Sequence, residues 1–236
     1  MNNMRKVFCG LAVFCVGSSN GAALPDALIR YRIAAQICDT NFSSKEAAVS
    51  KECRHLFYKA LRDCGHKYPE HVVVENGNDT RAETHYYNNC LYHKITFDEK
   101  RWSNFPIGVR RIVAFHEAMH IVKRHNGNSI IEEREADCGA LTMGKCRKCA
   151  LESAQWHFEE SKRKGEREYK SLEEIAKKTE GSLRSLLDYT QIRSFVYKDT
   201  HPLHVERGLT TYLRLKEMSS SMCDYHEIEE VGKYLV

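Results

Sequence analysis

The residues best suited to chemistry lie in one short stretch, H-E-A-M-H from His116 to His120. Residues four apart on a helix lie above one another on the same face, so His116 and His120 can bind one metal ion with Glu117 beside it. Two such histidines and a glutamate are typical of zinc peptidases, in which the glutamate is the general base. Because the chain has 12 histidines, the prediction requires a third ligand from another element.

A helical hairpin is predicted to supply that ligand. The first helix should begin near Pro106, which is well tolerated in a first turn, and continue to about Arg124. The Asn-Gly pair at 126–127 is a good left-handed stop, and Ser129–Glu132 form a capping box that begins a second helix. The two helices should therefore run antiparallel, joined by a tight turn.

The positions of residues along the two helix axes then indicate which side chains lie opposite each other. At about 1.5 Å of rise per residue, Glu133 is level with His120, and Asp137 is level with His116. This places Glu133 as the third ligand. Asp137 is placed as the carboxylate that binds the non-metal nitrogen of a ligand histidine, His116.

Three neighbouring residues are alternative ligands. His125 follows His120 by five positions, whereas the metzincin pattern requires six and an intervening glycine. Glu132 and Glu135 flank Glu133, and we interpret both as part of a solvated acidic helix face.

The order of these motifs resembles the gluzincin peptidases, in particular the family that includes the CAAX prenyl protease, the heat-shock protease HtpX and smaller exported relatives. H-E-x-x-H is followed by E-x-x-A-D, here Glu133 to Asp137. The relatives also carry S/T-H-P and a downstream arginine, matched by Thr200-His201-Pro202 and Arg207. The resemblance covers Phe97 to about Met218, and the short spacing between the first two motifs implies a minimal soluble version.

This resemblance implies a zinc-dependent endopeptidase with one zinc ion per chain. The implied ligands are His116, His120 and Glu133, and Glu117 is the implied general base. Asp137 is implied to support a ligand, and His201 to donate to the developing oxyanion, with Arg207 holding the His201 segment in place. A surface or capping role is the alternative for His201. The alternative function is a zinc-containing chaperone-like or interaction protein with little turnover.

A small sheet is expected before the metal helix. The segment His71–Val74 is β-like, and Cys90–Phe97 alternates, with one face formed by Leu91, His93, Ile95 and Phe97. In zinc peptidases the strand before the metal helix commonly forms the edge along which a peptide substrate lies. An ordinary core strand is the alternative.

The N-terminus has the layout of a secretory signal peptide. Arg5 and Lys6 precede an apolar run at 7–17 and small residues up to Ala23, where cleavage is expected. A membrane anchor is the alternative, but it requires about 20 apolar residues. We therefore expect an exported protein, periplasmic or secreted, with no transmembrane span after cleavage.

Cysteine content and charge agree with export and limit the partners. Eight cysteines follow residue 23, which allows up to four disulfides. Cys146 and Cys149 form a C-x-x-C pair, for which a structural disulfide is favoured over a redox pair or half a zinc knuckle. The formal charge of +4 includes Arg5 and Lys6, so the mature chain carries +2, too little to predict nucleic-acid binding.

The predicted fold class is α+β, a mainly helical zincin-like domain with a small sheet. One domain at 24–236 is expected, with a disulfide-stapled helical segment at 24–70 and the sheet edge and metal site at 71–145. A charged helical insertion at 150–195 precedes the T-H-P motif, C-terminal helix and tail at 196–236. The expected substrate is a protein or peptide, and the charged helices at 150–188 are a candidate partner surface.

Overall fold

The computed structural model describes residues 49–87, 90–125, 129–165, 183–196 and 200–218. The predicted signal peptide, the first part of the helical segment expected at 24–70, the Asn-Gly turn at 126–127 and the tail after 218 lie outside these residues. Part of the charged insertion, 166–182, does so as well.

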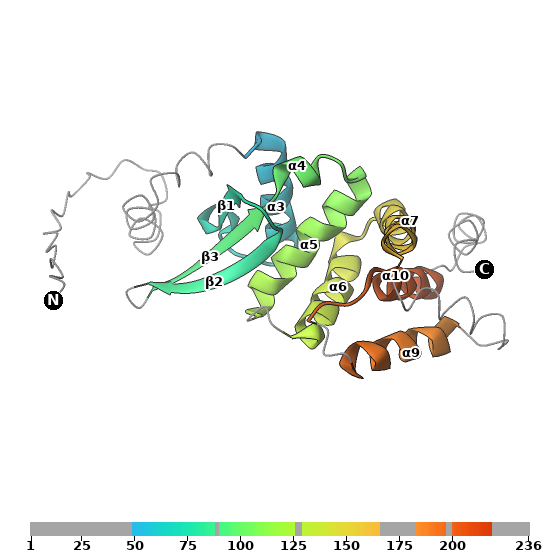
Figure 1. Cartoon of the computed structure of the whole chain (residues 1–236). Helices are drawn as coiled ribbons and strands as arrows, with labels where there is room; N and C mark the ends of the chain where they lie inside the picture. Colours follow the sequence, from blue (N-terminus) through green and yellow to red (C-terminus); the bar gives the residue numbers. More distant parts are fainter. Residues whose placement is uncertain (1–48, 88–89, 126–128, 166–182, 197–199, 219–236) are drawn as a thin grey trace, which may run out of the picture.

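The fold is mainly helical with one small sheet (Figure 1), as predicted. In chain order, the elements are α3 (Lys51–Asp63), the 3-10 turn η1 (Pro69–His71), β1 (Val73–Asn76), β2 (Arg81–Tyr87), β3 (Cys90–Phe97), α4 (Glu99–Trp102), α5 (Ile107–Lys123), α6 (Ile130–Gly144), α7 (Arg147–Lys164), α9 (Leu183–Val196) and α10 (His204–Met218). None of the helices in the described part of the chain is both long and apolar enough to cross a bilayer.

The sheet has the strand order β1-β3-β2. β1 pairs parallel with β3, with Val73 opposite Lys94, whereas β2 pairs antiparallel with it, with Arg81 opposite Thr96. The predicted strand is therefore present as β3, but it is the central strand of the described sheet.

The predicted edge role of Leu91, His93, Ile95 and Phe97 is wrong for this reason. Ile95 and Phe97 are fully buried in the core, and the His93 ring contacts Thr84 on β2. The Leu91 side chain lies outside the description. The alternation of side chains predicted a half-buried strand, but it could not show whether that strand lies at the edge or in the centre of the sheet. The outer strand on the side of α5 is β2.

An aromatic cluster joins the sheet to the helices. Phe57 from α3 lies 5.2 Å from Phe97 of β3 and 5.0 Å from Trp102 of α4, measured between ring centroids. All three side chains are buried. Because α3 also packs on α5, this cluster anchors the sheet beside the helix that carries His116.

The helical hairpin is formed by α5 and α6. α5 ends at Arg124, which adopts the left-handed conformation with φ 59°, and Ser129 caps α6 by accepting a hydrogen bond from the Ile131 amide. The left-handed stop therefore falls at Arg124, earlier than the predicted Asn-Gly pair, because the Arg124 and His125 amides already bond the last carbonyls of α5.

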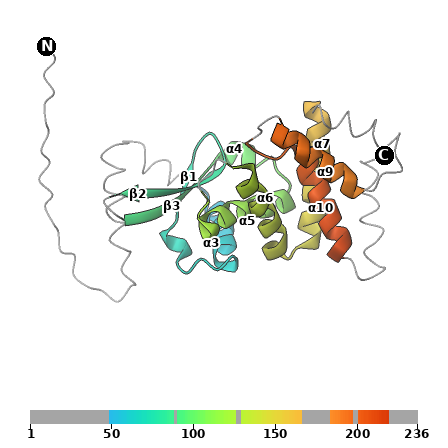
Figure 2. The same ribbon diagram turned by 90° about the horizontal axis from the view of Figure 1, so that it is seen from below.

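The remaining helices cover the other side of α5. α7 packs on both α5 and α10, and α9 packs on α10 (Figures 1 and 2). A largely buried ion pair joins this group to the hairpin: Arg134 of α6 donates to Glu206 of α10 at 2.6 Å and to the Gln191 carbonyl at 3.2 Å.

The cysteines confirm one disulfide prediction and correct another. Cys146 and Cys149 are disulfide-bonded at the start of α7. Cys53 on α3 and Cys64 directly after it belong to the segment at 24–70 that was expected to be disulfide-stapled, but both are free and buried. Cysteine spacing does not fix partners, because pairing depends on which elements meet in space.

The first turn of α5 approaches α7 closely. The Gly108 amide donates to the Glu152 carboxylate at 2.9 Å, and a Cβ at position 108 would lie 2.8 Å from the Cys149 Cα. The position of α5 relative to α7 therefore depends on the absence of a side chain at Gly108.

We predict that Gly108→Ala lowers the free energy of unfolding by about 1–3 kcal/mol, because the added methyl group meets main-chain atoms that cannot move aside. Gly144→Ala is the matched control, since its Cβ would meet only ordinary contacts of 3.7 Å or more. Denaturant unfolding of both variants measures the difference. Equal stabilities would contradict the close packing of α5 on α7.

Candidate metal centre

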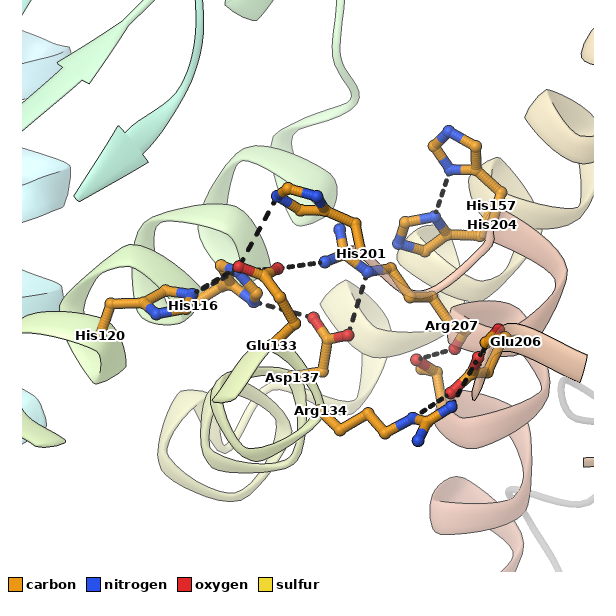
Figure 3. A network of polar contacts seen from close by, with 12 residues as sticks. His116, His120, Glu133, Arg134, Asp137, His157, His201, His204, Glu206 and Arg207 are labelled. Atoms are coloured by element: carbon orange, nitrogen blue, oxygen red, sulfur yellow. Dashed lines mark hydrogen bonds and ion pairs between the residues drawn. The ribbon is translucent and has the colours of Figure 1, made fainter. Parts of the chain in front are cut away.

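Two imidazoles from α5 and one carboxylate from α6 converge in the interior (Figure 3). The Nε2 atoms of His116 and His120 lie 3.0 Å apart. Each of these atoms also lies 3.3 Å from a carboxylate oxygen of Glu133. All three residues are buried, and the group could bind a metal ion.

The donor set fits zinc. Two histidine nitrogens and one glutamate oxygen are a ligand set that catalytic zinc sites use, with a further position left for water or substrate. The helix repeat places His116 and His120 on one face, and the antiparallel packing of α6 brings Glu133 to their level. The structure therefore brings together the three residues that the sequence nominated.

Asp137 supports one of the two imidazoles. Its carboxylate lies 2.8 Å from Nδ1 of His116, the contact predicted from the helix levels. This hydrogen bond occupies Nδ1 and leaves Nε2 facing the centre, where a metal ion can replace the Nε2 proton. Burial lowers the pKa of His116, but the nearby Asp137 and Glu133 carboxylates outweigh it and raise the pKa to about 10. The same carboxylates favour any cation bound at the ring.

Arg207 connects α10 to both carboxylates of α6. Its guanidinium lies 2.8 Å from the Glu133 carboxylate and 3.0 Å from that of Asp137. Burial raises the pKa of Glu133, but hydrogen bonds from His116 and His120 and the charge of Arg207 bring it well below its usual range. Glu133 is therefore ionised, as a metal ligand must be.

Glu117 lies beside the converging residues and borders the same cavity. It is 5 % exposed. Burial raises the pKa of its carboxyl, against the opposing effect of His116 and His120. A raised pKa makes a carboxylate a stronger base, which suits it to accept a proton near neutral pH.

The centre opens into a cavity of about 700 Å³. The segment Asp79–Thr84, which includes the start of β2, borders it on one side. Side chains from α7 and α10 border it on the other, together with Phe105 and Arg101. The cavity thus gives the three converging residues access to a ligand of substantial size.

His201 lies at the mouth of this centre. Its side chain is 63 % exposed, and its Nε2 lies 3.8 Å from the Glu133 carboxylate. Thr200 Oγ1 contacts the other ring nitrogen, Nδ1, at 2.9 Å. The ring therefore presents its Nε2 edge to the centre.

Sequence reasoning missed the contact between His125 and His120. Their Nδ1 atoms lie 3.1 Å apart, and Nε2 of His125 lies 3.3 Å from the Glu135 carboxylate. Glu135, interpreted as purely solvated, also pairs with Lys123 at 3.2 Å. This contact could have been predicted, because His125 directly follows the cap of α5, but the sequence had suggested His125 only as an alternative metal ligand.

Three further residues of the cavity wall were also missed as site residues. They are Trp156, His157 and His204. No motif marks them, because α7 and the start of α10 reach the cavity only through helix packing.

Comparison of the chain with protein-family models, curated proteins and solved structures gave no match. The resemblance to gluzincins therefore rests on the motifs and on the geometry of the residues that they contain.

We predict that Asp137→Asn lowers the affinity for zinc about 10–100-fold, because the amide supports His116 less strongly than the carboxylate does. Competition with a chromophoric chelator measures this affinity. Glu132→Gln makes the same chemical change on the same helix outside the group of three ligands and is expected to leave the affinity unchanged. An unchanged affinity in Asp137→Asn would show that the carboxylate does not support a metal ligand.

Proposed function

We propose that this protein is a zinc-dependent endopeptidase of the gluzincin type, resembling the family of the CAAX prenyl protease and HtpX. The observation that carries the proposal is the position of Glu117, a buried carboxylate beside three converging ligands, on the wall of an open cavity. A purely structural zinc site would be closed by four protein ligands and would not require such a base.

In this proposal His116, His120 and Glu133 hold the zinc ion. When bound, zinc supplies Lewis-acid chemistry, which polarises the scissile carbonyl and acidifies a water molecule. Glu117 accepts the proton of the attacking water and passes it to the leaving amine. His201 donates from Nε2 to the negative charge that develops on the carbonyl oxygen.

The substrate is proposed to be a protein or peptide in extended conformation. β2 is one of the two outer strands of the described sheet, and its first residues, Arg81–Thr84, border the cavity. Main-chain groups on the free side of an outer strand can pair with an extended peptide as an added strand. β2 therefore takes the role that the sequence prediction had given to β3.

Export of the protein belongs to the same proposal. The disulfide between Cys146 and Cys149 is of a kind that persists in oxidising compartments. The N-terminal segment up to Ala23 has the composition of a signal peptide. We propose a periplasmic or secreted location, without nucleic-acid partners.

We predict that Glu117→Gln lowers kcat for hydrolysis of unfolded casein by about 10²–10⁴-fold, because the amide cannot accept the proton of water. Zinc content is expected to stay at one ion per chain, since Glu117 is not among the proposed ligands. Release of labelled fragments and metal analysis provide the two measurements, with Glu132→Gln as the matched control.

Two results would contradict this proposal. A chain without stoichiometric zinc lacks the proposed cofactor. A chain that binds zinc but leaves casein intact, in both the wild type and Glu117→Gln, is better described by the alternative of a zinc-containing interaction protein.

A further inference from the structure

A chain of three polar side chains runs from the surface of α7 to the cavity. The ammonium group of Lys164 lies 2.8 Å from Nε2 of His204. Nδ1 of His204 lies 3.0 Å from Nδ1 of His157 (Figure 3). Both histidines border the same cavity as the metal centre.

The order of the contacts determines where each proton lies. A lysine ammonium can only donate, so Nε2 of His204 is the acceptor. A neutral His204 then carries its proton on Nδ1 and donates it to Nδ1 of His157. A neutral His157 must in turn carry its proton on Nε2. The network thus makes Nε2–H of His157 a hydrogen-bond donor.

The charges around the two rings keep both of them neutral. Burial, Lys164 and Arg207 lower the pKa of His204 to about 4. Burial, followed by Arg207 and His204, lowers the pKa of His157 well below its usual value, against a weaker opposite effect of Asp137. Glu160, which lies 3.7 Å from Lys164, keeps the ammonium group at the end of α7.

His157 presents this donor to the cavity. The residue is only 8 % exposed, yet it borders the cavity. Its Nδ1 is occupied by His204, and Nε2 forms no hydrogen bond with any residue in the described part of the chain. A largely buried N–H group gains free energy by pairing, so it favours an acceptor that enters the cavity.

The opposite wall of the cavity indicates what that acceptor is. β2 and α7 lie on opposite sides of α5 (Figure 1). In an extended peptide, successive carbonyl groups point to alternate sides, so a peptide paired with β2 directs its other carbonyls away from the sheet. The guanidinium of Arg207 is already engaged by Glu133 and Asp137. His157 thus offers a neutral donor on the α7 side, which suits a neutral acceptor.

We propose that His157 binds the substrate by donating its Nε2–H to a main-chain carbonyl oxygen of the peptide in the cavity. His204 and Lys164 are positioning residues, which hold His157 in the tautomer that donates. The proposal rests on the proposed function, because it takes a peptide along β2 as the occupant. It adds recognition of the main chain, which does not depend on the substrate's sequence.

Binding of fluorescein-labelled unfolded casein to zinc-loaded Glu117→Gln protein tests this contact without turnover. Adding His157→Phe, which keeps a ring but removes the donor, is expected to weaken binding roughly 3- to 10-fold, the value of one hydrogen bond. Adding His157→Gln, which retains an N–H donor, is expected to keep binding within about 2-fold of the parent. Anisotropy titrations give the three affinities.

Kinetics with Glu117 intact separate binding from a general structural effect. His157→Phe is expected to raise KM for casein by the same factor with kcat unchanged, as expected when substrate and transition state lose the same contact. Equal binding by the parent and His157→Phe, or equal weakening by both His157 variants, would overturn the proposal. So would a parent protein that does not bind unfolded casein.

The two proposals can fail separately. If casein binds with the expected order of affinities but is never hydrolysed by the wild type, the peptidase proposal fails and His157 stands as a peptide-binding residue. If casein is hydrolysed but its affinity does not change in the His157 variants, only the proposed role of His157 fails.

The proton positions can be measured without any substrate. Nitrogen-15 NMR of the histidine side chains is expected to show His157 protonated on Nε2 at pH 7. Lys164→Met is expected to populate the other tautomer, whereas the exposed control Lys162→Met leaves the signals unchanged. A proton on Nδ1 of His157 in the unmodified protein would contradict the direction of the hydrogen bonds inferred from Lys164 through His204 to His157.

Discussion

The contact of Arg207 with two buried carboxylates is the interaction on which the rest of the site depends. Glu133 and Asp137 lie one turn apart on α6, and both are mostly removed from water. A cation that contacts both carboxylates helps them to remain ionised together. Arg207 supplies such a cation from α10, 74 positions after Glu133 and 70 after Asp137. Its charge thereby links the position of α10 to the ionisation of Glu133, a candidate metal ligand.

This constraint also shapes the cavity. α10 is held against α6 at Arg207 and again at Glu206, whose carboxylate bonds Arg134 and Ser194. The segment before α10 then carries His201 to the mouth of the centre, and the start of α10 brings His204 beside α7. Loss of the Arg207 contact would therefore disturb His201 and the α7–α10 wall as well as the ligands. The candidate metal centre and the α7–α10 wall of the cavity thus form one electrostatic unit.

The elements packed on the two sides of α5 contribute different groups to the cavity. On one side, the aromatic cluster of Phe57, Phe97 and Trp102 anchors the sheet and so fixes the position of β2 at the border of the cavity. On the other side, α7 contributes His157, which contacts His204 of α10 and, through it, Lys164. An extended chain between these walls would meet main-chain groups on one side and a neutral donor on the other. Such a cavity favours recognition of backbone over side chains.

Local patterns in the sequence were sufficient for the hairpin. The spacing of His116 and His120, the capping serine at 129 and the helical rise placed Glu133 and Asp137 correctly, because two short antiparallel helices separated by only six residues have few possible registers. The disulfide between Cys146 and Cys149 was also predictable, since its partners lie within one turn of each other.

Tertiary structure alone decided the rest. The central position of β3 depends on β1, which pairs with it parallel from a distance in the sequence, so alternation could not reveal it. The free state of Cys53 and Cys64 depends on which elements pack together. The cavity wall formed by His157 and His204 arises where α7 meets α10, a contact between segments whose own patterns indicate only buried faces. Sequence therefore determined the residues that converge within one hairpin, whereas helix packing decided what faces them.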